Sequence, residues 1–227
     1  MIIFRNLNLF LCLIYAGFIL AVDVNLDIKP TLKNQKIQKE IIKKVKEEHF
    51  FKVNNIVDIN NIFQQKLIEN LDPSKVYFTK LEVEQYGNNF NNEIFNLNNS
   101  FEILNKYFNR LIEATSFQIE ILKDFSFDFS KSEYIDIHPD DNQWKSSFAE
   151  LRKEWFLITK NDLLNELLDA DESDETEIKQ ILIDRYERRI RRITQRNNED
   201  YFSIIMNNFT DQFDPHSAYL SPKSAED

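Results

Sequence analysis

The chain has 227 residues, only 2 glycines, and a formal net charge of −10 from 28 basic and 38 acidic residues. The acidic balance argues against a nucleic-acid partner, because such binding relies on clustered lysines and arginines. A many-stranded barrel, or a loop whose backbone N–H groups bind an anion, needs backbone positions that glycine supplies, so the composition favours an all-α fold.

The first stretch has the pattern of a secretory signal peptide. Residues 1–22 carry one positive charge, Arg5, followed by an almost unbroken apolar run. This run is shorter than the roughly 20 apolar residues that span a membrane. We therefore expect a signal peptide over 1–21, with cleavage near Ala21, and an uncleaved membrane anchor is the alternative. The exported part would contain no disulfide, because Cys12 lies in the leader.

After an extended N-terminal segment over 22–36, apolar side chains recur every three or four residues, which predicts helices joined by short loops. The expected helices run from about 33 to 50, from an N-cap at Asp58 to the stop at Asp72-Pro73, from the capping box of Thr79 and Glu82 onward, and from Asn99 to Leu122. We expect these helices to pack as antiparallel hairpins.

Residues 125–143 break the helical period. Three phenylalanines alternate there with polar residues: Phe125, Phe127 and Phe129. The motif at 138–141, His-Pro-Asp-Asp, has turn chemistry. We interpret this stretch as an ordered loop whose aromatic side chains pack against the helices, and a short edge strand or a substrate-binding aromatic patch are alternatives. A helix is expected to resume around Trp144 and to run to Leu168.

The last fifth of the chain predicts two helices separated by a break. Apolar residues form one stripe on the first of them: Leu182, Tyr186, Ile190 and Ile193. The second helix is expected to start at Asn198, whose side chain can accept a free backbone N–H. It should end near Phe213, because Pro215 disfavours helical geometry at Asp214.

Three motifs in this region resemble the end of the N-terminal helical domain of the bacterial tail-specific protease, also called the carboxy-terminal processing protease. They are RYERRIRR at 185–192, NNEDYFS at 197–203 and FDPHSAYLSP at 213–222. Weaker similarity occurs in HFF at 49–51 and in LIENLDPSKVYFTKLEVEQY at 67–86. The resemblance implies one irregular all-α domain over 37–222, followed at 223–227 by the start of a linker to a PDZ module that this chain lacks.

The residue types of a catalytic triad occur in the final turn, at Asp214, His216 and Ser217. They lie within four consecutive positions, and adjacent side chains cannot let an imidazole bridge the other two. We therefore interpret the motif as a helix-ending turn in which Asp214 or Ser217 bonds the backbone.

The acidic run over 169–177 is a candidate calcium loop. Asp171 and Ser173 would be ligands, but Asp174 stands where the loop needs glycine and Gln180 where it needs a bidentate glutamate. We interpret the run as a solvated linker whose later acids favour the start of the next helix. The 3 histidines are too scattered for a metal site. We therefore assign no metal, cofactor or catalytic residue.

Five arginines share a helical face beside the apolar stripe: Arg185, Arg188, Arg189, Arg192 and Arg196. Asp184 with Arg188, and Glu187 with Arg191, have the spacing of ion pairs within a helix. In the structural interpretation, the arginine stems cover the edge of the core and their heads pair with neighbouring acids. In the functional interpretation, the first four dock against another domain of the same protease.

The resemblance also implies a function. In the family, an exported periplasmic serine endopeptidase cleaves proteins from a nonpolar C-terminal tail with a Ser nucleophile and a Lys base. This chain would supply the N-terminal scaffold or substrate-admission domain, inactive by itself because the motifs that carry that dyad are absent. Its partners would be the PDZ and catalytic unit, periplasmic substrate proteins or an adaptor lipoprotein. A free-standing helical adaptor or inhibitor of envelope proteins and a calcium-responsive acidic module are the alternatives.

Overall fold

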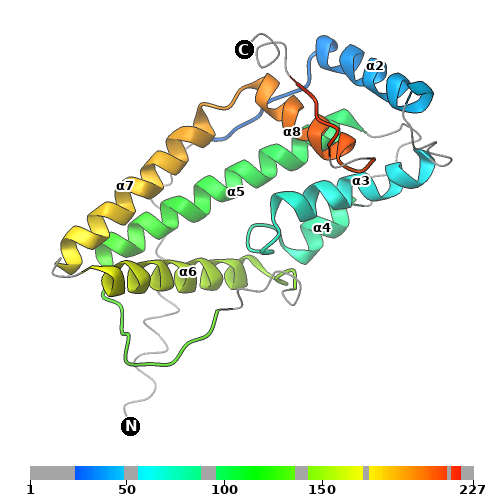
Figure 1. Cartoon of the computed structure of the whole chain (residues 1–227). Helices are drawn as coiled ribbons and strands as arrows, with labels where there is room; N and C mark the ends of the chain where they lie inside the picture. Colours follow the sequence, from blue (N-terminus) through cyan, green and yellow to red (C-terminus); the bar gives the residue numbers. More distant parts are fainter. Residues whose placement is uncertain are drawn as a thin grey trace. The chain divides into compact units, whose positions relative to one another are not determined.

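The structure is a computed structural model that describes residues 24–48, 56–87, 96–135, 143–170, 174–213 and 216–220. These residues contain seven helices and no strand beyond an isolated bridge between Thr79 and Lys145 (Figure 1). The all-α prediction is therefore confirmed. The helices are α2 (Leu32–Glu48), α3 (Ile56–Leu71), α4 (Lys80–Gly87), α5 (Leu97–Asp124), α6 (Phe148–Asp169), α7 (Glu175–Thr194) and α8 (Asn198–Thr210).

No helix in the described ranges has the length and apolar character needed to cross a membrane. The expected signal peptide and the expected linker at 223–227 lie outside the described residues.

Several predicted helix starts are wrong by a few residues. α3 already includes Ile56, so Asp58 lies inside its first turn. α5 begins at Leu97, where Asn96 Oδ1 accepts the N–H of Asn99 at 3.2 Å. Asn99 is itself buried and donates through its side chain to the carbonyl of Tyr86 at 3.3 Å. A local capping pattern therefore located this helix but selected the wrong asparagine.

The start of α8 shows the same kind of shift. Asn197, one residue before the predicted cap, accepts the N–H groups of Glu199 at 2.8 Å and Asp200 at 3.3 Å. The Asp200 carboxylate accepts the N–H of Asn197 at 2.8 Å, which completes a capping box. The helix ends at Thr210, and a turn carries the chain to Phe213.

Two further boundaries differ from the expectation. α2 begins at Leu32, within one residue of the helix expected from about 33, so the end of the segment over 22–36 that we expected to be extended is helical. α6 begins at Phe148 after the N-cap Ser147, so Trp144 precedes the helix instead of opening it. The backbone beside Trp144 is held by the Lys145 carbonyl, which accepts the N–H of Lys80 at 2.8 Å.

The chain forms two compact units, and each is assembled from segments that are separate in sequence. The first unit contains Ser74–Lys80 and Asn109–Thr194, and the second contains Leu26–Pro73, Leu81–Phe108 and Gln195–Asp227. α5 belongs to both, because its residues up to Phe108 lie in the second unit and the rest lie in the first.

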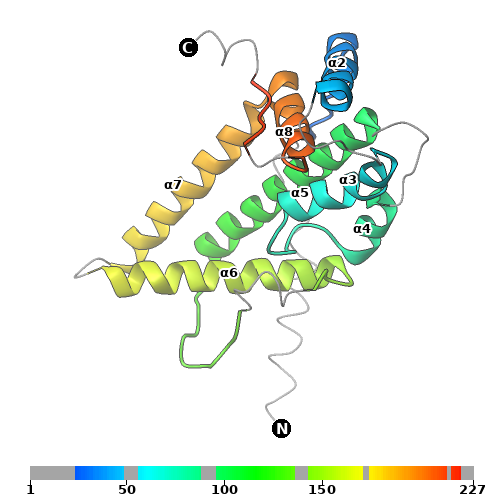
Figure 2. The ribbon, with the colours of Figure 1, turned by 45° about the vertical axis from the view of Figure 1, so that its right-hand side comes forward.

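The core of the first unit lies where α5, α6 and α7 meet. It is made of side chains from these helices and from the loop after α5: Ile119, Ile121, Leu122, Phe127, Leu163, Ile178, Leu182, Ile183 and Tyr186. Ile190 packs against this cluster and Ile193 is buried, so the apolar stripe predicted on α7 is confirmed. In Figures 1 and 2, α6 and α7 form a hairpin that opens away from its turn.

A second cluster in the first unit surrounds Trp155, which is 1% exposed. Its indole N–H donates to the carbonyl of Val76 at 2.7 Å, and its ring contacts Phe148 and Phe117 edge to face or tilted. The hydrogen bond joins α6 to the segment between α3 and α4, which is buried at Val76 and Phe78. A buried indole N–H needs such a partner.

The core of the second unit is built from α3, the first part of α5, and α8. Its fully buried apolar side chains are Phe63, Leu67, Ile68, Phe101, Ile103, Leu104, Tyr201, Phe202, Ile205, Met206 and Phe209. Phe63 on α3 meets Phe209 on α8 with ring centroids 6.0 Å apart, and the two helices lie side by side in Figure 2. Ile28 ties the preceding extended segment to this unit, because its N–H and carbonyl both bond the Asn105 amide, at 3.1 and 2.9 Å.

The two tryptophans provide a test of this packing. We expect Trp155→Phe to lower the free energy of unfolding by about 2 kcal/mol, because it leaves the Val76 carbonyl without its donor and opens space in the core. Trp144→Phe is the matched control and should cost less, since Trp144 is only half-buried. Urea denaturation of both variants measures the difference, and equal losses would contradict the assignment.

Candidate docking surface on helix α7

The arginines of α7 do not share one environment. Arg185 Nη2 lies 2.6 Å from Glu166 Oε1 on α6, in an ion pair across the hairpin. The Arg189 guanidinium lies over the ring of Tyr186, 5.0 Å from its centroid. Two of the four predicted docking residues therefore have contacts within the first unit: Arg185 pairs with an acid of the neighbouring helix, and Arg189 lies over a ring of its own helix.

Tyr186 anchors this part of the hairpin. Its ring is buried, and its hydroxyl donates to Asp162 Oδ2 at 2.6 Å. Burial, followed by the neighbouring Asp162 carboxylate, raises the pKa of Tyr186 far above its usual value, and Arg189 partly opposes the shift. The Tyr186 hydroxyl therefore remains a neutral donor throughout the physiological range.

Arg188 and Arg192 are different. Both are exposed, and they lie one helical turn apart. The expected pair between Asp184 and Arg188 is not found among the described contacts, since Asp184 Oδ1 accepts the side-chain amide of Gln180 at 2.8 Å. The structure records no partner for either arginine within the described residues. These two guanidinium groups are therefore the part of the predicted surface that is available to another molecule.

Arg191 and Arg196 complete the group. Arg191 pairs loosely with Glu187, at 3.7 Å, as its spacing predicted. Such an exposed pair contributes little to stability. Arg196 lies in the second unit, where its guanidinium is 4.7 Å from the ring centroid of Phe108.

The aromatic loop after α5 packs inward, as the ordered-loop interpretation expected. Phe127 is 8% exposed, and the rings of Phe125 and Phe127 lie 5.2 and 5.4 Å from Phe156 on α6. Within 125–135 no edge strand is present. These phenylalanines therefore belong to the core, which does not favour the alternative of a substrate-binding patch. The turn motif at 138–141 lies outside the described residues.

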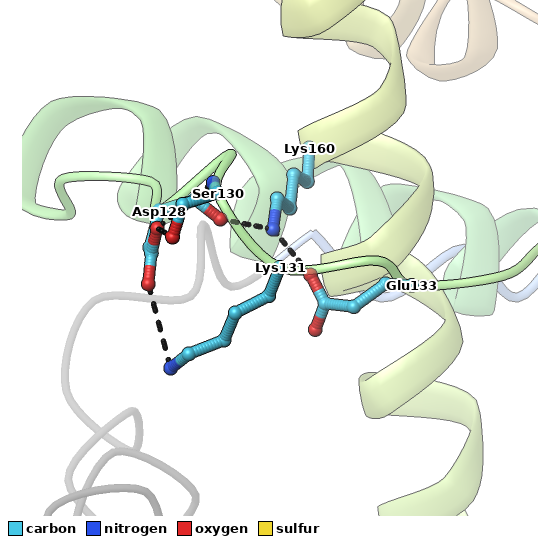
Figure 3. A network of polar contacts seen from close by, with 5 residues as sticks. All are labelled: Asp128, Ser130, Lys131, Glu133 and Lys160. Carbon is cyan, nitrogen blue, oxygen red and sulfur yellow. Dashed lines mark hydrogen bonds and ion pairs between the residues drawn. The ribbon is translucent and has the colours of Figure 1, made fainter.

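A polar network around Lys160 fastens this loop to α6 (Figure 3). Lys160 Nζ donates to the backbone carbonyl of Asp128 at 2.5 Å and forms an ion pair with the Glu133 carboxylate. Asp128 Oδ1 in turn accepts from the hydroxyl and the N–H of Ser130, at 2.6 and 3.0 Å. The Lys160 side chain is only 12% exposed. Sequence reasoning did not identify this network, because Lys160 and Asp128 are far apart along the chain.

The Ser130 hydrogen bonds lower the pKa of Asp128 to about 2, and Lys131, 3.4 Å from the carboxylate, acts in the same direction. Hydrogen bonds to the ionised form have this effect because protonation would break them.

Comparison with known proteins identifies the family. The sequence model of the family described as "Tail specific protease N-terminal domain" matches residues 32–223. The chain belongs to the tail-specific protease family. A curated tail-specific protease of Haemophilus influenzae is 26% identical over 217 residues, which cover 88% of this chain and 31% of that relative. The chain thus spans about a third of the length of that relative, and the resemblance based on the three C-terminal motifs is confirmed.

The other candidate sites of this tail-specific protease domain carry less information. Asp174, Glu175 and Glu177 are exposed at the start of α7, and Glu175 pairs with Lys179 at 2.8 Å. The described residues contain no group of three metal-ligating side chains, and Asp171 and Ser173 lie outside them. Asp214 also lies outside, so the interpretation of the final turn stays a prediction.

The hydrogen-bonded Asp128 carboxylate makes a pH-dependent contribution to the stability of the domain. Its pKa is lower in the folded chain than in the unfolded chain, so this stability is present above about pH 4 and is lost as the pH falls toward about 2. We expect Asp128→Asn to be less stable than the parent at neutral pH, with a difference that shrinks over that acid range. Denaturant titrations at several pH values measure it. Glu177→Gln, at an exposed acid without a recorded partner among the described residues, is the control, and parallel pH profiles for Asp128→Asn and the parent would contradict the assignment.

Proposed function

We propose that this chain is the scaffold and substrate-admission domain of an exported serine endopeptidase that acts in the periplasm on proteins with suitable C-terminal tails. Two findings support the proposal: the family match to an N-terminal domain, and a relative named for tail-specific proteolysis of which this chain covers 31%. The leader-like pattern at 1–21 supports export. The Ser–Lys centre that the family resemblance implies would belong to the part of the protease that follows this domain.

The observation that carries the scaffold role is the exposed pair Arg188 and Arg192. A guanidinium group presents several donors in a fixed plane and suits bidentate contact with carboxylates. Two such groups one turn apart on a helix form a small basic surface on a chain whose net charge is −10. We propose that this surface docks the domain onto an acidic surface of the catalytic region of the same protease.

The other arginines support this assignment through their contacts. Arg185 pairs with Glu166 on α6 and so helps to fix α7 against that helix, whereas Arg189 is held over the Tyr186 ring of its own helix. Docking through Arg188 and Arg192 would therefore use a helix that is already held in place. A preorganised surface loses less conformational entropy on binding than a mobile one.

The proposal that this domain is inactive without the catalytic region has a direct test. We expect the purified chain alone to show no peptidase activity toward a tail-bearing protein, because it holds no recognisable nucleophile and base. Cleavage that disappears when a residue of this chain is substituted would overturn the proposal. Contaminating protease is excluded by that same substitution control, measured by gel-based cleavage with the parent chain and the variant purified in parallel.

The docking surface is tested in the full-length protease. We expect Arg188→Gln with Arg192→Gln to lower kcat/KM for a tail-bearing protein on the order of tenfold at low salt, with a smaller effect at high salt. The melting temperature should stay close to that of the parent, because neither side chain has a recorded partner in the described part of the chain.

Lys123→Gln with Lys153→Gln is the matched control. Both lysines are exposed in the first unit, and the pair removes the same charge. If the arginine pair and the lysine pair lower kcat/KM equally, the effect is one of net charge and the docking surface is refuted.

A further inference from the structure

The segment after α8 is folded back on that helix and held there. Tyr219 N–H donates to Asn207 Oδ1 at 2.7 Å, near the end of α8. The Tyr219 hydroxyl donates to Glu199 Oε1 at 2.9 Å, in the first turn of the same helix. The contacts therefore extend along most of α8, and all of them lie within the second unit.

The ring of Tyr219 adds an apolar contact between these two hydrogen bonds. It meets Phe202 edge to face, with centroids 5.3 Å apart, and Phe202 is fully buried in the core of the second unit. Such an aromatic pair contributes about 1 kcal/mol beyond the burial of its area. Leu220, the next residue, is 64% exposed. The attachment therefore depends on Tyr219 and does not extend to its neighbour.

The hydroxyl keeps its proton under ordinary conditions. Burial, together with the hydrogen bond to the Glu199 carboxylate, raises the pKa of Tyr219 to about 12. The donor to Glu199 is therefore present throughout the pH range in which proteins are handled. The attachment combines two hydrogen bonds and one ring contact on three side chains of a single helix.

We propose that Tyr219 is a positioning residue that fixes the point at which the chain leaves this domain. If Tyr219 were released, the chain between Phe213 and Leu220 would act as a tether with an end-to-end distance of about 15 Å in any direction. With Tyr219 attached to Glu199, Phe202 and Asn207, the exit point is fixed on α8. The region of the protease that follows then starts from one place on the second unit.

This inference rests on the proposed function, because it assumes that a catalytic region follows the domain. The Tyr219 attachment and the docking surface use different residues in different units, since Tyr219 lies in the second unit and Arg188 and Arg192 lie on α7 in the first. The two proposals can therefore fail separately.

The attachment itself is tested in this chain by hydrogen exchange. We expect the amide at position 219 to exchange at least tenfold more slowly than in an unstructured peptide, and Asn207→Ala to remove that protection. Tyr134→Ala is the control, because Tyr134 is 89% exposed and distant in sequence. Exchange at the free-peptide rate in the parent, or unchanged protection in Asn207→Ala, would overturn the attachment.

The positioning role is tested in the full-length protease. One spin label is placed on the second unit and one in the region that follows, and the distance distribution is measured by electron–electron double resonance. We expect Tyr219→Ala to broaden the distribution and to lower kcat/KM on the order of tenfold, while the lost ring contact and hydroxyl hydrogen bond lower the melting temperature by only a few degrees. Tyr219→Phe keeps the ring contact. We therefore expect its distance distribution to be narrower, and its kcat/KM higher, than those of Tyr219→Ala.

The outcomes distinguish the two proposals. A distribution in Tyr219→Ala as narrow as in the parent refutes the positioning role, and the docking surface stands or falls on the arginine variants alone. A broadened distribution with unchanged kcat/KM also refutes the role, since positioning would then have no effect on catalysis.

Discussion

The constraint on which this fold depends is the burial of both halves of the long helix α5, each half in a different core. The helix places Phe101, Leu104 and Phe108 in the core of the second unit, and Ile119 and Leu122 in that of the first. A helix of 28 residues with apolar faces in two cores is unstable alone, and tertiary packing supplies most of its stability. Both cores therefore depend on one continuous helix, with the other elements completing each of them.

The arginines of α7 illustrate how a single residue type divides between structure and function. Arg185 pairs with Glu166 across the hairpin, and Arg189 lies over the ring of Tyr186, a buried residue of its own helix. Arg188 points into solvent from the same helix. Composition and helical spacing placed all of these residues on one face, but only the contacts in the folded structure separate the arginines that have partners from those that remain exposed.

Local periodicity predicted the helices well, because the burial of an amphipathic stripe such as that of α7 is encoded within a few turns. Helix starts were less accurate, since Asn96 and Asn197 compete with nearby asparagines for the same capping role. The Lys160 network and the Tyr219 attachment were missed for a different reason. Each joins residues between 12 and 32 positions apart, and such pairs leave no periodic pattern in the sequence. The docking surface was only partly predictable, because helical spacing places its arginines on one face but does not show which of them have partners in the folded chain.

The interleaved order of the segments affects how the chain is made. Phe63 is synthesised early, but its ring partner Phe209 follows only about 150 residues later, roughly ten to thirty seconds at ordinary rates of translation. During that interval the apolar side of α3 lacks the helix that covers it. The apolar side chains of α3 that α8 covers therefore stay uncovered until the end of synthesis, and exposed apolar surface of this kind favours aggregation.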